Sequence, residues 1–192
     1  MTLIKKTKAQ YSKVKQIKLN APLISRIIFA ILFLYIISLF VNIKMVIFLI
    51  VVLFVNISME NFRLRGNLPA DFELSTFSTV MVTVAFGLEW GIFTAVFSKL
   101  ITSIATGNLL ADHFFMILTY VNAAFFAYFL RSMNIFGLGM VIVSINCILM
   151  WLISKNLLGL DPTSNLSYTG TNFVFNFLVF SIFSELIKVI LM

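Results

Sequence analysis

Polar side chains that could hold a small ligand recur at the ends of long apolar runs in this sequence of 192 residues. Carboxylates and amide oxygens accept hydrogen bonds, whereas amide nitrogens, hydroxyls and an imidazole N–H donate them. Helix N-termini add free backbone N–H groups and a partial positive charge. Together such groups could bind a molecule that carries both donors and acceptors. The candidate ligand-binding residues are Glu73, Thr76, Asp112, His113, Asn172 and Asn176.

The same residues also have a purely structural interpretation. Asp112 stands at an expected helix start, where aspartate is a good cap. Asparagine amides within a membrane bundle often bond to neighbouring helices and lock them together. His113 beside Asp112 is a lone pair of side chains, which does not make a metal site. The sequence leaves the binding and the structural interpretation open.

Lys99 is the clearest ionisable residue inside an apolar run. Charged groups within membrane spans are costly and are therefore functional candidates by default. A lysine can also reach the membrane interface along its long stem, or form a structural pair with a carboxylate such as Glu89. We expect one of these two structural roles more than a functional one.

Signatures of catalysis are absent from the sequence. It contains no HExxH zinc motif, no GxSxG nucleophile elbow and no GxxxxGK[ST] phosphate loop. One histidine and one cysteine, Cys147, supply few of the groups that an intramembrane enzyme needs. We therefore expect no enzymatic activity, no catalytic residue, no metal and no cofactor. Nucleic acid is not an expected partner, because basic residues are not interleaved with aromatic ones outside the apolar runs.

The composition predicts an integral membrane protein. Hydrophobic residues make up 61% of the chain and charged residues 11%, and the mean hydropathy is +1.07. A soluble domain is nearer one half apolar, and apolar runs of this length suit helices that cross a bilayer. We expect an all-α, polytopic bundle of six or seven transmembrane helices, a multi-pass protein of the cell membrane whose first partner is the lipid bilayer.

The first half of the chain is expected to hold a basic tail and two spans. Residues 1–20 are rich in lysine and predict a tail or a short helix on the membrane surface, which holds the N-terminus in the cytoplasm. Residues 21–192 are expected to form a single transmembrane domain. The apolar region 23–58 would make a helix of about 54 Å, too long for a core of about 30 Å. We therefore predict two helices, 23–42 and 45–58.

A helical hairpin is predicted between Asp71 and His113. Two apolar runs meet at a turn from Gly87 to Gly91, and glycine permits the backbone angles of a sharp reversal. Each run carries small or hydroxylated residues at helical spacing, which lets two membrane helices approach closely. These residues are Thr76, Thr79 or Val80, Thr83 and Gly87 on the first run, and Gly91, Thr94 or Ala95, Ser98, Thr102 and Ala105 on the second.

The remaining spans are predicted at 113–131, 140–155 and 172–192. Counting crossings puts the loops 59–73, 106–112 and 156–171 on one membrane side, and tight turns on the other. One face of the bundle is therefore rich in polar loops and suited to receive a ligand or a partner. It carries Glu60, Asp71, Glu73, Asp112, His113 and Asp161.

The order of these features resembles the substrate-binding (S) components of energy-coupling-factor vitamin transporters. The resemblance covers roughly residues 60–192 and rests on a polar loop running into Phe72-Glu73-Leu74, on Phe86-Gly87 followed by Gly91, on Gly107-Asn108 with Asp112, and on a late Asn172 and Asn176. It implies six helices, a ligand pocket beneath the loops of one face, and no ATPase of its own. The implied partners are a vitamin-like small molecule, a transmembrane coupling protein and ATPase subunits.

Some features differ from that family. The turn Gly87-Leu88-Glu89 lacks the family's proline, and the alanine-x3-alanine pattern expected in the first helix is missing. Seven crossings with the lysine-rich tail inside would place the loop-rich face in the cytoplasm, whereas an uptake component needs that face outside. The chain also resembles the rod-shape-determining membrane protein D family. That resemblance implies a membrane scaffold of the cell envelope that recruits protein partners.

Overall fold

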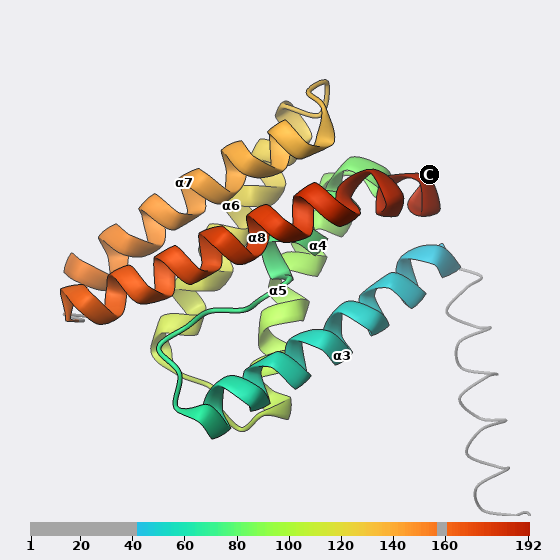
Figure 1. The fold of residues 1–192 in the computed structure, drawn as a ribbon. Helices are drawn as coiled ribbons and strands as arrows, with labels where there is room; N and C mark the ends of the chain where they lie inside the picture. Colours follow the sequence, from blue (N-terminus) through green and yellow to red (C-terminus); the bar gives the residue numbers. More distant parts are fainter. Residues whose placement is uncertain (1–41, 157–160) are drawn as a thin grey trace, which may run out of the picture. The chain divides into compact units, whose positions relative to one another are not determined.

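The computed structural model describes residues 42–156 and 161–192, and the described residues from Ile43 onward belong to one compact unit. This part of the chain is all-helical, as predicted (Figure 1). The predicted tail 1–20 and the predicted helix 23–42 fall outside the described residues, apart from Asn42. The six described helices are α3 (Ile43–Gly66), α4 (Ser75–Phe86), α5 (Leu88–Ala105), α6 (Ala111–Phe129), α7 (Ile135–Asn156) and α8 (Pro162–Leu191).

Four of these helices, α3, α5, α7 and α8, are long and apolar enough to cross a membrane. Helix α4 is different, because it has only 12 residues and its first nine, Ser75 to Thr83, are all buried. It packs against α5, α6 and α8, so that it forms the centre of the unit. Its Phe77 ring meets Phe180 of α8 edge to face, with the ring centroids 4.9 Å apart.

The predicted hairpin is present and consists of α4 and α5. Gly87 makes the turn with a φ of 97°, and its N–H donates to the Thr83 carbonyl at 2.9 Å. Gly91 serves a different purpose from the predicted one, because it lies inside α5 and faces Thr83. A Cβ at Gly91 would overlap the Thr83 hydroxyl and lie 3.3 Å from the Cβ of Ala124. The small residue thus permits the close approach of two backbones.

The hydroxyl-bearing faces of the two runs are buried, as expected for a close interface. Several of these hydroxyls donate to backbone carbonyls of their own helix, because a threonine or serine can bond to the carbonyl four residues earlier. Thr83 donates to Thr79 at 2.7 Å, and Thr102 donates to Ser98 at 2.8 Å. The buried residues of the two faces are Thr76, Thr79, Thr83, Gly91, Thr94, Ser98 and Thr102.

Three predicted helix boundaries are wrong. Helix α7 starts at Ile135, five residues before the predicted start at 140. Helix α3 continues to Gly66, eight residues beyond the predicted end at 58, so that Glu60 and Arg63 lie on a helix and not in a loop. Helix α8 starts at Pro162 and not at Asn172. The Asp161 side chain caps it by accepting from the N–H groups of Thr163 and Ser164, and proline suits the first turn, where no N–H is needed.

Candidate functional site

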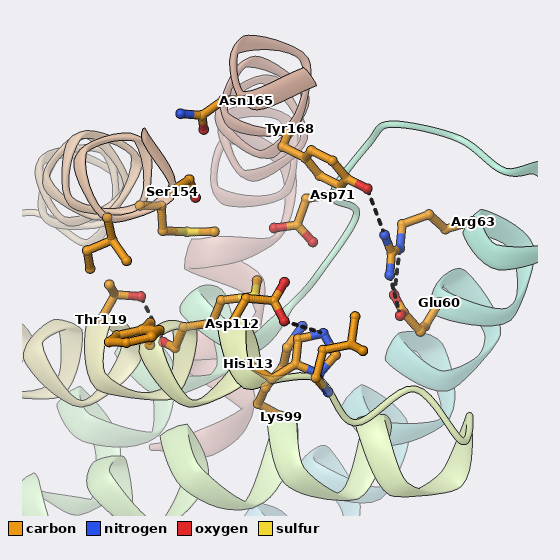
Figure 2. A pocket seen from close by; sticks show the side chains of 15 residues that line it. Glu60, Arg63, Asp71, Lys99, Asp112, His113, Thr119, Ser154, Asn165 and Tyr168 are labelled. Carbon is orange, nitrogen blue, oxygen red and sulfur yellow. Dashed lines mark hydrogen bonds and ion pairs between the residues drawn. The ribbon is translucent and has the colours of Figure 1, made fainter. Parts of the chain in front are cut away.

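A cavity of about 270 Å³ lies at the end of the unit where α3, α5 and α7 end and α6 and α8 begin. Figure 2 shows its side chains converging from these helices and from the segment that precedes α4. One part of the lining is apolar and includes Phe115, Met116, Met150 and Ile153. The polar and charged part consists of Glu60, Arg63, Asp71, Lys99, Asp112, His113, Thr119, Ser154, Asn165 and Tyr168.

Asp71 and Glu73 are placed by a non-helical segment, residues 67–74, between α3 and α4. Residues 70, 71 and 73 of this segment are buried, and buried backbone without helical bonds needs other partners. Side chains of two helices supply them. The N–H of Leu74 donates to Asn56 of α3 at 2.8 Å, and the N–H of Asp71 donates to Thr171 of α8 at 3.0 Å. The Pro69 carbonyl accepts from Ser167 of α8 at 2.6 Å.

Glu73 is the acceptor at the centre of a buried network. It forms an ion pair with Lys99 of α5, with Nζ 2.6 Å from Oε2, and accepts from the Tyr120 hydroxyl of α6 at 3.0 Å. Its other oxygen accepts from Ser75, which in turn accepts from Ser98 at 3.0 Å. The side chains of Lys99 and Glu73 are only 5% and 6% exposed, so the ion pair is shielded from water. Lys99 therefore neither reaches the interface nor pairs with Glu89.

Asp71 belongs to a second network, which runs along α8. Its Oδ2 accepts from Asn172 Nδ2 at 2.8 Å, and Asn176 Nδ2 donates to the Asn172 carbonyl at 3.0 Å. Asn146 of α7 donates to Thr76 at 3.4 Å on the neighbouring part of α4. Burial, and next the negative charge of Glu73, raise the pKa of Asp71 to about 6. Lys99, Asn172 and Arg63 oppose that rise.

Stability is expected to depend on the protonation of Asp71. Its folded pKa lies above the ordinary value near 4, so the folded protein holds the proton more tightly, and stability is lost as pH rises from about 4 to about 6. Asp71→Asn removes this titration. The melting temperature of the variant minus that of the wild type, measured in detergent, should increase over this pH window. A constant difference would contradict the raised pKa.

His113 and Asp112 both line the cavity, but His113 is buried whereas Asp112 lies at the opening of the cavity. The Nδ1 of His113 is 2.9 Å from the Ser103 hydroxyl of α5 and accepts from the Leu110 N–H at 3.4 Å. The proton of the neutral ring is therefore on Nε2, which lies 3.9 Å from Asp112 Oδ1. Asp112 is not the cap of α6, because Leu110 holds that position and makes no side-chain cap bond. The Asp112 side chain is 38% exposed, so the cavity reaches the surface there.

Comparison with protein-family models, curated proteins and solved structures found no match.

The structure brings the six candidate residues together without placing all of them in the cavity. Asp112 and His113 line it, and Glu73 lies behind Lys99. Asn172 holds Asp71 from α8, whereas Thr76 and Asn176 lie further along the buried networks. Binding of a ligand by these residues stays a prediction. Asn172 does not open the last helix as expected, because α8 begins ten positions earlier.

Sequence reasoning did not assign several of the lining residues. Arg63 pairs with Glu60 on the last turns of α3 and donates to the Tyr168 hydroxyl of α8 at 3.2 Å. Glu60 also accepts from Asn108 at 2.8 Å. Charged residues within apolar runs are the available signal in the sequence, but Glu60 and Arg63 lie in the loop predicted at 59–73, so only Lys99 stands out.

Proposed function

We propose that this chain is a membrane-embedded binding subunit for a small, vitamin-like molecule, without an ATPase of its own. The observation that carries the proposal is the cavity of about 270 Å³, which combines an apolar wall with charged groups from α3, α5, α6 and the segment before α4. Ligand sites are typically concave, mostly apolar and furnished with a few convergent polar groups. A volume slightly below the usual range of about 300–1,000 Å³ favours a compact ligand.

The proposal includes the membrane topology and the partners. The protein crosses the cell membrane six or seven times, with α6, about 28 Å long, as a further span. Helix α4, at about 18 Å, is shorter than the core of about 30 Å and is surrounded by α5, α6 and α8, while the segment before it belongs to the loop-rich face. Uptake against a gradient then requires energy from a transmembrane coupling protein and ATPase subunits. Genes for such subunits beside this coding region would support transport.

The proposal can be tested by filling the cavity. Ser154→Phe places a bulky ring in its lining, whereas Ser181→Phe places the same ring on an exposed face of α8. Each purified full-length protein would be incubated with a deproteinised small-metabolite extract, washed, and analysed by mass spectrometry. We expect wild type and Ser181→Phe to retain a common small molecule that Ser154→Phe retains at least about tenfold less, because the ring occupies the binding volume.

Retention of the same molecules by all three proteins would contradict binding in this cavity. Retention of none by the folded wild type would favour the alternative function, a scaffold of the rod-shape type that recruits protein partners. A cell-wall or cytoskeletal gene neighbourhood would point in the same direction.

A further inference from the structure

Two carboxylates of the cavity have no salt bridge to a lysine or arginine among the described residues. Asp71 is only 6% exposed, and its bound oxygen, Oδ2, is held by the neutral amide of Asn172. Its Oδ1 accepts no hydrogen bond from the part of the chain that the structure describes. Oδ1 of Asp112 is buried and also has no hydrogen-bond partner. Figure 2 shows both side chains pointing into the cavity.

The two cations of the cavity are already engaged. Arg63 donates through Nε and Nη2 to Glu60, and through Nη1 to Tyr168. Lys99 is 2.6 Å from Glu73. Four carboxylates, Glu60, Asp71, Glu73 and Asp112, thus stand against two cations, and the balance around the cavity is negative. A buried carboxylate without a counter-charge is costly, so a cation that enters this space is stabilised.

We propose that the ligand of this cavity is a small organic cation, with an ammonium or guanidinium group placed between Asp71 and Asp112. This inference rests on the proposed function. The N–H groups of such a cation donate to the carboxylates of Asp71 and Asp112, which makes charge-assisted hydrogen bonds. The apolar wall formed by Phe115, Met116, Met150 and Ile153 receives the rest of the molecule.

An inorganic cation fits less well. Calcium takes six to eight oxygen ligands, and magnesium needs a regular octahedron. The described residues contain no group of three or more His, Cys, Asp or Glu side chains that could hold a metal ion. An anionic ligand would meet Arg63 and Lys99 only by displacing their present partners.

The charge preference can be measured without knowing the ligand. Cys147→Ala removes the only native thiol, and Ser154→Cys adds one at the cavity. The full-length protein in detergent would be treated with trimethylammonioethyl methanethiosulfonate, a cation, or sulfonatoethyl methanethiosulfonate, an anion. Each rate would be divided by that of free 2-mercaptoethanol. We expect the cation to be favoured by at least about tenfold, because two carboxylates without a lysine or arginine partner line the same cavity as Ser154, in a medium of reduced dielectric.

Neutral variants locate the source of the preference. Asp71→Asn keeps the acceptor for Asn172, and Asp112→Asn changes a partly exposed side chain, so both preserve the shape of the site. Each should lower the cation-to-anion ratio severalfold. The neighbouring Lys155 favours the anion and therefore works against the expected result.

The possible failures are distinguishable. Rapid labelling by both reagents, with a ratio at or below one, or a ratio that both aspartate variants leave unchanged, would overturn the cationic ligand while the cavity stands. Absence of labelling by either reagent in a monodisperse protein would show that the cavity is closed, and would overturn the proposed function as well.

Discussion

Glu73→Gln is expected to destabilise the folded protein more than any other single change of charge, by about 3–5 kcal/mol. The substitution keeps the size of the side chain but leaves the Lys99 ammonium, 5% exposed, without its ion-pair partner. A buried charge without a partner carries the full cost of leaving water. The loss should appear in equilibrium unfolding of the purified protein in mixed detergent micelles, and as a lowered melting temperature.

Two further variants identify the cause. Lys99→Met in the Glu73→Gln background removes the unpaired cation and should recover most of the lost stability, because neutral replacement of a buried pair is often tolerated. Glu89→Gln makes the same change on an exposed residue next to the turn of the hairpin and should alter stability by no more than about 0.5 kcal/mol. If the double variant is no more stable than Glu73→Gln, the cost comes from the network and not from the lysine charge.

Gly91→Ala is expected to destabilise the protein by about 1–3 kcal/mol, although alanine is the better helix former. The added methyl group overlaps the Thr83 hydroxyl, so α4 and α5 must separate where their backbones are closest. Gly170→Ala is the matched control on α8, where a Cβ meets nothing within 4 Å. There the same change should raise stability by up to about 1 kcal/mol.

A double-mutant cycle ties the loss at Gly91 to its neighbour. Thr83→Ala removes the overlapping hydroxyl but keeps its Cβ, which lies 2.9 Å from the position of the new methyl group. The Gly91→Ala change should therefore cost less in that background, with a coupling energy of at least about 0.5 kcal/mol. Equal costs in both backgrounds would show that the hairpin relaxes without resistance at this contact.

The hairpin could be predicted because its information is local. Small and hydroxylated residues at helical spacing mark close-packed faces on each run separately, and Gly87 marks the turn. The start of α8 could not be predicted in the same way, because residues 156–171 are polar and resemble a loop. Threonine hydroxyls of that region donate to carbonyls of their own helix, as Thr169 does to the Asn165 carbonyl at 2.8 Å. These polar side chains therefore need no water, although the composition alone suggests a solvated loop.

The candidate site could be predicted only in outline. Crossing counts brought acidic residues to one end of the bundle, but the partner of Lys99 lies 26 positions away, and that pairing is tertiary. The sequence of the segment before α4 does not predict its burial. The hydrogen bonds that its backbone N–H groups need come from Asn56 and Thr171, on helices distant in the sequence. Spacing along one chain carries no information about such contacts.

The buried segment before α4 also has a mechanical consequence. Among the described residues, three hydrogen bonds hold α8 to it, from Ser167 to Pro69, from Thr171 to the Asp71 N–H, and from Asn172 to the Asp71 carboxylate. Each contributes about 1 kcal/mol net, and more where a charge takes part. The Gly91 contact, in contrast, packs α4 closely against α5. A separation of α8 from this segment would break the three bonds together. It would leave intact the Glu73–Lys99 ion pair, which joins the segment to α5. Asp71, which takes part in two of the three bonds, is therefore the residue through which α8 is held to the rest of the bundle.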